Sequence, residues 1–256
     1  MIKVLKNTKN FTSLHFKEET PTTVNSIRRS LMRKVDTLAI EDVYITENNS
    51  ALYDEILAHR LGLIVLHTPN DLVKRSECSC KNKGCAKCLV EYVLKIKGPV
   101  TVYAKDLVSN HPKAKPVNTE AVITELLENQ ELNLKATAEL NNGANHTKHS
   151  TGLSSHYFKP ILKINQKNVT NPKEILDSCP TKVFDIKSGK LEVAKKDNCI
   201  NCGACVELTN QPEAITLTTD NSDVVLNFEN WGQLTNKEVF DKALTNLETE
   251  IKTLEI

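Results

Sequence analysis

The stretch "ETPTTVNSIRRSLMRKVDTLAIEDVYITEN", residues 19–48, predicts a helix that leads directly into a strand. Thr20 is a helix-capping residue, and Pro21 takes the first helical position, where its missing N–H costs no hydrogen bond. Apolar residues then recur every three or four positions from Val24 to Leu31, which is the helical period. The alternating apolar residues that follow are typical of a strand.

Strands dominate the sequence around this stretch, apart from one short helix predicted over residues 53–63. We expect a strand pair at the N-terminus. Residues 91–107 predict two strands with a Gly-Pro break, and residues 131–140 alternate strictly between apolar and polar positions. Residues 141–157 are polar and are expected to be irregular. This mixture indicates the α+β fold class.

The C-terminal segment predicts a strand over 222–230 and then a helix that begins with a capping box, Thr235 and Glu238. Apolar residues follow at alternating spacings of four and three, which is a narrow, heptad-like seam. The seam consists of Phe240, Leu244, Leu247, Ile251 and Leu254. It predicts packing either on the chain's own domain or on a helix of another protein.

The composition excludes some classes of protein. The 256 residues include 33 basic and 32 acidic side chains, a net charge of +1. Proteins that bind nucleic acid through phosphate contacts usually have a clear basic excess. The N-terminal residues contain no long apolar run, which predicts neither a signal peptide nor a membrane span. We therefore expect a cytoplasmic protein without membrane contacts.

Eight cysteines fall into two groups of four with none left over. In a reducing compartment such groups indicate metal sites rather than disulfides. The first group is Cys78, Cys80, Cys85 and Cys88, and the second is Cys179, Cys199, Cys202 and Cys205.

The second group has the spacing of an iron–sulfur site. The segment "CINCGACVEL", residues 199–208, supplies three cysteines at two-residue spacing, and Cys179 is followed by Pro180. A Cys-Pro pair typically supplies the remote ligand to such a trio, so the group predicts one [4Fe–4S] cluster. A three-iron form is an alternative, and so is zinc, although zinc usually favours two separated Cys pairs. The "KSGK" segment between the ligands predicts a short hairpin.

The first group, "CSCKNKGCAKC", places four thiols within residues 78–88. A compact set of four cysteines is typical of a closed, structural zinc site. Unligated or redox-active thiols are the alternative. Lys81, Lys83 and Lys87 are predicted to offset the negative charge of a zinc ion held by four thiolates.

Residues 23–66 resemble the D subunit of archaeal RNA polymerase, a relative of the bacterial α subunit and of the eukaryotic third-largest subunit. The matches are Asn25, Arg28 and Arg29 in the helix, "LAIEDV" in the strand, and "DEILAHRLGLI" at 54–64. The stretch "NHTKHSTG" is similar to a further family motif but lacks its tryptophan and proline. Some relatives also have a cysteine loop near 78–88 and a ferredoxin-like insertion.

The resemblance implies three domains. Residues 1–40 and 221–256 would form a discontinuous α/β dimerisation domain, 41–165 an inserted β-rich domain, and 166–220 a ferredoxin-like iron–sulfur domain. It also implies pairing with the small L subunit of RNA polymerase, which would form a platform for the two large catalytic subunits. DNA would be reached only through the complex.

The resemblance implies a non-catalytic scaffold subunit. No Asp triplet of the polymerase magnesium-binding type is present. It implies that Arg28, Arg29, Glu55 and Arg60 are partner contacts, and it explains the C-terminal seam as part of the dimer interface. His59 lies in the same segment, but nothing marks a pocket or a nucleophile around it.

Two other functions compete with this interpretation. A single-cluster electron-transfer component of an oxidoreductase would use the cluster but leaves residues 23–66 unexplained. A zinc-based nucleic-acid-binding module conflicts with the near-neutral charge and with an aromatic content of only 5%.

Overall fold

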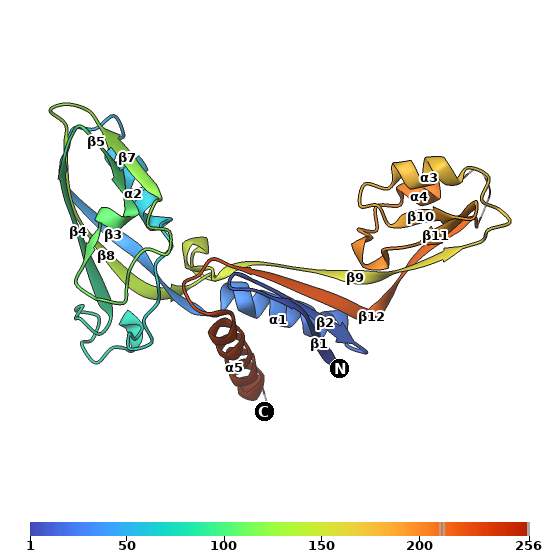
Figure 1. Cartoon of the computed structure of the whole chain (residues 1–256). Coiled ribbons are helices and arrows are strands. Elements are labelled where there is room, and N and C mark those ends of the chain that lie inside the picture. Colours follow the sequence, from blue (N-terminus) through green and yellow to red (C-terminus); the bar gives the residue numbers. More distant parts are fainter. Residues whose placement is uncertain (210, 212, 255–256) are drawn as a thin grey trace. The chain divides into compact units, whose positions relative to one another are not determined.

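The structure, a computed structural model, describes residues 1–209, 211 and 213–254. The chain forms two compact units, each built from segments that are far apart in the sequence (Figure 1). The first unit combines Met1–Leu5, Ser13–Asn25 and His156–Leu226. The second combines Lys6–Thr12, Ser26–Ser155 and the chain from Asn227 onward. The predicted three-domain division stays a prediction.

Helices and strands together give the expected α+β class. The helices are α1 (Pro21–Arg33), α2 (Asp54–Gly62), α3 (Pro172–Ser178), α4 (Ala204–Glu207) and α5 (Asn236–Leu254). The strands are β1 (Ile2–Asn7), β2 (Phe11–Lys17), β3 (Asp36–Asn48), β4 (Leu89–Lys97), β5 (Val100–Tyr103), β6 (Val108–Ser109), β7 (Val122–Leu126), β8 (Glu131–Asn142), β9 (Gly152–Ile164), β10 (Phe184–Lys187), β11 (Lys190–Val193) and β12 (Ile215–Asn230).

Helix α1 confirms the prediction made from residues 19–48. The Thr20 hydroxyl oxygen accepts a hydrogen bond from the Thr23 backbone N–H at 3.2 Å, as expected of a capping residue. Val24 and Leu31 are both fully buried. The helix ends at Arg33, and β3 begins at Asp36.

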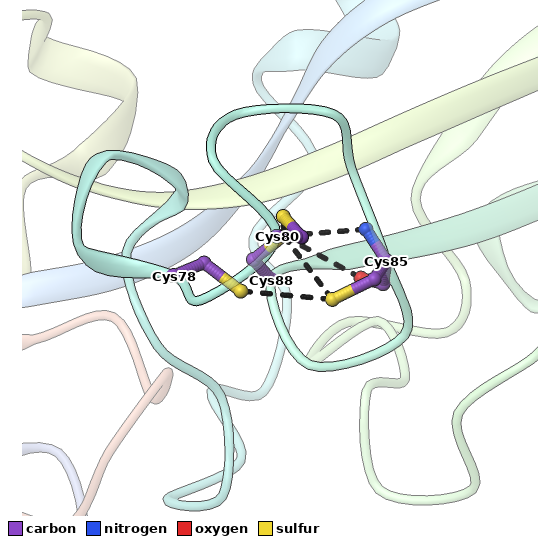
Figure 2. Close-up of side chains that lie close together, drawn as sticks. All are labelled: Cys78, Cys80, Cys85 and Cys88. Atoms are coloured by element: carbon purple, nitrogen blue, oxygen red, sulfur yellow. Dashed lines mark hydrogen bonds between the residues drawn. The ribbon is translucent and has the colours of Figure 1, made fainter.

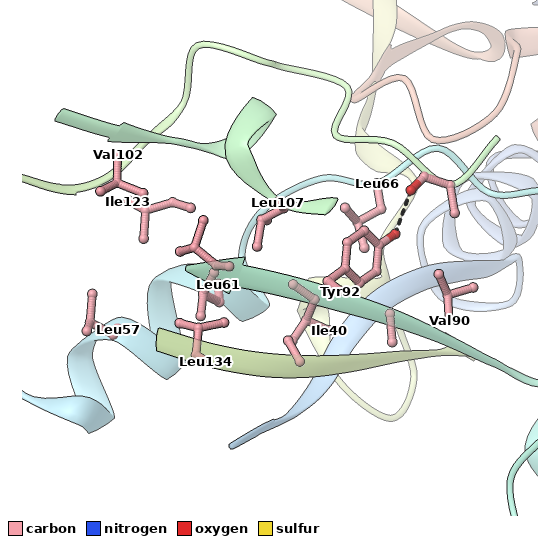
Figure 3. Packing of buried hydrophobic residues seen from close by; sticks show 14 of the residues in the cluster. Ile40, Leu57, Leu61, Leu66, Val90, Tyr92, Val102, Leu107, Ile123 and Leu134 are labelled. Carbon is pink, nitrogen blue, oxygen red and sulfur yellow. Dashed lines mark hydrogen bonds between the residues drawn. The ribbon is translucent and has the colours of Figure 1, made fainter. Parts of the chain in front are cut away.

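The larger hydrophobic core lies in the second unit. Four antiparallel strands form a sheet in the order β3-β8-β4-β6, with β5 and β7 as a separate pair. Leu132, Leu134 and Ala136 of β8 are buried, so the alternation predicted for this strand is confirmed. Helix α2 adds Leu57 and Leu61 to the same cluster (Figure 3).

Tyr92 of β4 shows how this core accommodates a polar atom. Its side chain is completely buried, and its hydroxyl donates a hydrogen bond of 2.8 Å to the Ala114 carbonyl oxygen (Figure 3). Burial raises the pKa of the Tyr92 phenol, because the charged form would lose its solvation. The phenol therefore stays protonated and acts as a fixed donor.

The sheet β1-β2-β12-β9 differs from the prediction in two places. Residues 141–157 were expected to be irregular, but β9 begins at Gly152. A Cβ atom at Gly152 would lie 1.9 Å from the Glu229 carbonyl oxygen, so only glycine allows the two backbones this close. Pro160 is tolerated within β9 because this is an edge strand.

The strand predicted at 222–230 is also longer than expected, since β12 is continuous from Ile215 to Asn230. The polar residues in its middle are mostly exposed. A polar run therefore interrupts the hydrophobic pattern without interrupting the strand.

The cysteine-bearing part of the first unit has its own small core. Strands β10 and β11 form the predicted hairpin, in which Ser188 and Gly189 both have positive φ, at 49° and 77°. This backbone is that of a two-residue hairpin loop. The core consists of Ile175, Val183, Phe184, Leu191, Cys205 and Ile215.

Helix α5 begins with the predicted capping box. Glu238 accepts hydrogen bonds from the Thr235 backbone N–H and hydroxyl at 2.9 and 2.7 Å, and these bonds lower the pKa of Glu238 to about 2. Val239 and Ala243 are completely buried. Within the described part of the chain, no helix is long and apolar enough to cross a membrane.

Candidate metal centres

The loop between η1 (Arg75–Glu77) and β4 brings the first four cysteines together. The Sγ atoms of Cys78 and Cys85 are 3.6 Å apart, those of Cys80 and Cys88 3.7 Å, and those of Cys85 and Cys88 3.8 Å. All four sulfur atoms lie within 4.8 Å of one another, and Figure 2 shows them facing a common centre. This arrangement suits one metal ion.

Backbone geometry closes the loop around that centre. The N–H groups of Cys88 and Leu89 both donate to the Cys85 carbonyl oxygen at 2.9 Å, and the Cys85 N–H points to the Cys88 sulfur at 3.4 Å. Gly84 has a φ of 83°, and a Cβ atom there would come within 2.6 Å of the Leu89 side chain. Glycine is therefore required at this turn.

The thiols of Cys80 and Cys88 differ in acidity because burial and hydrogen bonding act on them to different extents. Burial alone would raise the pKa of the Cys80 thiol, but hydrogen bonds from Cys78, the Gly84 backbone and the other thiols lower it to about 7. Burial raises the pKa of the Cys88 thiol to about 12. The Cys80 thiolate thus forms near neutral pH, whereas Cys88 would need a bound cation to stabilise its charged form.

The second group of cysteines lines a single small cavity in the first unit. Cys179, Cys199, Cys202 and Cys205 all contribute to its wall. The apolar part of that wall comes from Val183, Phe184, Ile200, Ala204 and Leu217. Cys179, which lies 20 residues before the trio, thus lines the same cavity as the other three cysteines.

The sulfur atoms of this second group are more widely separated than those of the first. Among the described residues, only the 78–88 cysteines form a group whose ligand atoms all lie within 4.8 Å. The four cysteines are still close enough to interact electrostatically. Burial raises the pKa of the Cys205 thiol, and the charges of Cys199, Cys202 and Cys179 raise it further. Wide separation around a common cavity suits a multi-atom cluster better than a single ion.

Two residues that sequence reasoning missed hold the cysteine trio in place. Asn201, with a positive φ of 55°, donates from its side-chain amide to the Phe158 carbonyl oxygen of β9 at 3.1 Å. Lys159 forms an ion pair of 3.3 Å with Asp197. An asparagine between two cysteines is a signal for such a turn, because asparagine tolerates this backbone conformation.

The predicted seam on α5 is partly exposed. Phe240 contacts the Phe228 ring edge to face at 5.7 Å, and Leu247 is half-buried. Leu244, Ile251 and Leu254 are 41%, 59% and 76% exposed. Within its own unit, α5 instead buries the face that carries Val239 and Ala243. Most of the seam thus remains available on the described chain.

The four predicted polar contact residues differ in their surroundings. Arg28 is half-buried and donates to the Ser154 carbonyl oxygen at 3.4 Å. Arg60 donates to the Ile123 carbonyl oxygen at 2.8 Å. Arg29 and Glu55 are exposed, and neither forms an ion pair with another described residue.

Comparisons with known proteins point to one family. The profile described as "RNA polymerase Rpb3/RpoA insert domain" matches residues 43–162. The chain is 37% identical to the DNA-directed RNA polymerase subunit Rpo3 of Methanosphaera stadtmanae, over 83% of this chain and 82% of the relative. It is 34% identical to Rpo3 of Methanopyrus kandleri, over 90% and 85% of the two chains. For Rpo3 of Picrophilus torridus the identity is 30%, over 99% and 98%.

Proposed function

Since the chain belongs to the family of the DNA-directed RNA polymerase subunit Rpo3, the archaeal member of the α/Rpb3 group, we propose that it is an assembly subunit of that polymerase. The observation that carries this conclusion is identity above 30% over more than four fifths of both this chain and its relatives. The polymerase is a nucleotidyltransferase, and this subunit is non-catalytic.

We infer that the chain pairs with the small L subunit through a dimerisation domain made of residues 1–40 and 221–256. The exposed seam of α5 supports this pairing, because an apolar row of this kind is the usual element of a helix–helix interface. Leu244, Ile251 and Leu254 would form its centre.

The heterodimer would then act as the platform on which the two large catalytic subunits assemble. Arg28, Arg29, Glu55 and Arg60 remain the proposed polar contacts. Glu55 and Arg60 are on α2, and the residues that flank this helix, Tyr53 and Leu63, are 78% and 55% exposed. Exposed aromatic and apolar side chains beside charged ones are typical of the core and rim of a protein interface. Residues 41–165 would form the inserted β-rich domain that carries Glu55 and Arg60.

We propose that the first cysteine group binds zinc. An ion held by four sulfur atoms at about 2.3 Å in a tetrahedron keeps those atoms about 3.8 Å apart. Three of the six sulfur–sulfur separations, at 3.6 to 3.8 Å, agree with this value, and all six are within 4.8 Å. Zinc bound there would have no free coordination position, so it would stabilise the loop rather than act on a substrate.

We propose that the second group binds one [4Fe–4S] cluster in a ferredoxin-like domain, residues 166–220. Four cysteines around one cavity with wide sulfur separation support a cluster over a single zinc ion. The three-iron form remains the alternative. We expect a structural role, since Cys205 belongs to the small core of this part of the chain and Cys179 and Cys199 pack against it.

The test is anaerobic co-purification of the tagged chain from its native cell, followed by metal analysis. We expect two very large subunits and a small partner, with about four iron atoms and one zinc atom per chain. Recovery with a reductase or dehydrogenase, without polymerase subunits, would contradict the proposal. The electron-transfer alternative has no support from the relatives, each of which is a polymerase subunit.

A further inference from the structure

The loop of residues 78–88 contains two close sulfur pairs that share no member. In the first pair, the Sγ atoms of Cys78 and Cys85 are 3.6 Å apart. In the second pair, those of Cys80 and Cys88 are 3.7 Å apart. A disulfide has an S–S length of about 2 Å, so either pair forms one after a sulfur displacement of less than about 2 Å.

The two members of each pair differ in their access to solvent. Cys78 and Cys88 are buried, at 6% and 1% exposure, whereas Cys85 and Cys80 are only half-buried. A small oxidant therefore reaches Cys85 in the first pair and Cys80 in the second. In each pair an accessible sulfur lies against a buried one, which is the arrangement of an attacked thiol and its resolving thiol.

Contacts outside the sulfur atoms hold the two ends of this loop together. The Val73 N–H donates a hydrogen bond of 3.0 Å to the Lys87 carbonyl oxygen, which joins the residues just before and just after the first three cysteines. Lys74 forms an ion pair of 2.9 Å with Asp36 of β3. These contacts do not depend on a bound metal, so the sulfur pairs stay near each other when the site is empty.

One further contact competes with the two pairs. The Sγ atoms of Cys85 and Cys88 are 3.8 Å apart. A bond between them would take one sulfur from each pair and leave Cys78 and Cys80 as free thiols. Only the two separate pairs use all four sulfur atoms in their shorter contacts.

We propose that the 78–88 loop is a site of reversible oxidation, at which hydrogen peroxide converts the first and the second pair into two disulfides. The half-buried sulfur attacks the peroxide, so that an S–O bond forms, the O–O bond breaks and one oxygen leaves as water. The buried sulfur then attacks the oxidised sulfur, the S–S bond forms, and the second oxygen leaves as water. Each pair thus gives two electrons and two thiol protons to one peroxide molecule.

The oxidation also removes the ligands of a metal ion, because the thiolate is the form of cysteine that binds metal. A zinc ion at the site would therefore be released, and the two protons of each step would then come from water. This release rests on the proposed zinc site, whereas the pairing of the sulfurs does not. A thiol reductant reverses the reaction by exchange with each disulfide.

The first experiment treats the full chain with hydrogen peroxide in the presence of a zinc-binding dye, blocks the remaining thiols and maps the disulfides by mass spectrometry. Trypsin cleaves after Lys81, Lys83 and Lys87, so Cys85 and Cys88 are released on two peptides separate from the one that holds the other two cysteines. We expect all three peptides to be joined, and about one zinc ion to be released per chain. Thiols that stay free, or that become sulfinic acids without a disulfide, would overturn the inference.

The second experiment tests the pairing with single variants. We expect Cys80→Ser to form only the disulfide of the first pair, and Cys78→Ser only that of the second. Ser79→Ala, which changes the residue between them, is the matched control and should form both. A Cys85–Cys88 disulfide in both cysteine variants would show that the assigned pairing is wrong. Metal analysis of the untreated chain is a separate readout, since a chain without zinc refutes the proposed zinc site and leaves the disulfide map to decide the pairing.

Discussion

The Ser30 hydroxyl of α1 donates a hydrogen bond of 2.7 Å to the Ala243 carbonyl oxygen of α5, and both residues are buried. This bond joins helices whose contacting residues are 213 positions apart. The side-chain amide of Asn246 adds a second link, to the Lys34 carbonyl oxygen at 2.7 Å. These bonds fix which face of α5 is buried and therefore which face is left for a partner.

Ser30→Ala is expected to lower the free energy of unfolding by about 1 kcal/mol, because it removes a buried hydrogen bond. Chemical denaturation measures the change. Ser26→Ala, an exposed position on the same helix, is the control and should leave stability nearly unchanged. Equal effects at both positions would show that the bond to Ala243 contributes nothing.

Leu244→Asp/Ile251→Asp is expected to weaken pairing with the small L subunit about 30-fold or more, because it places charge in the centre of the seam. The thermal stability of the isolated chain should change little, since both side chains are already substantially exposed. Analytical ultracentrifugation with the small partner gives the affinity. Thr245→Asp/Thr249→Asp alters another face of α5, and comparable weakening by this pair would argue against the seam.

Cys88→Ser is expected to reduce zinc from about one atom per chain to none while leaving iron unchanged. Cys88 is the most buried ligand and lies next to β4, so the loop should also become sensitive to proteolysis. Metal analysis and limited digestion measure these two effects. Ser79→Ala, inside the same loop, is the control. Zinc that persists in the Cys88 variant would rule out the four-sulfur site.

Cys202→Ser is expected to show the converse, with loss of iron from about four atoms per chain and normal zinc. Cys202 is exposed at the wall of the cavity, so the substitution leaves the small core intact. Anaerobic iron analysis and visible absorption follow the cluster. If the cluster-free chain assembles and melts like the loaded form, the structural role proposed for the cluster is wrong.

His149 is expected to make stability depend on pH. It is fully buried, and burial lowers its pKa below the ordinary value of 6.5, although its Nδ1 donates a 2.9 Å hydrogen bond to the Thr37 carbonyl oxygen. The unfolded chain therefore binds a proton more readily than the folded one. Stability is retained above pH 6.5 and is lost as the pH falls below that value.

Glutamine does not titrate, so the His149→Gln variant should lose less free energy of unfolding than the wild type between about pH 7.5 and about pH 5.5. Denaturation curves at both pH values measure the difference between variant and wild type. His149→Phe is a second variant in case the first fails to fold. Burial opposes ionisation of Glu41, but Lys148 and His149 outweigh it and lower the pKa of this carboxyl, so its contribution is lost only in a more acidic range. An unchanged pH slope in both His149 variants would contradict the prediction.

The sequence by itself determined the features that depend on neighbours along the chain. Thr20 and Pro21 start α1, Thr235 and Glu238 cap α5, and the alternation over 131–140 defines β8. The sequence predicts these features because helix caps and hydrophobic periodicity depend on residues that are only a few positions apart in the chain. The grouping of eight cysteines into two sets followed from spacing for the same reason.

Only the tertiary structure decided the features that depend on distant partners. Strand β9 was missed because Gly152 and Pro160 are poor strand formers, and only its place at the edge of a sheet, against Glu229, accounts for them. Residues 7–10, 67–71 and 232–238 line one pocket although they lie in three separate segments of the chain, which no local pattern reveals. The sulfur separations that distinguish the two cysteine groups likewise depend on how each loop folds back on itself. Local spacing specifies elements and ligand types, whereas long-range contacts specify which faces meet and which remain open.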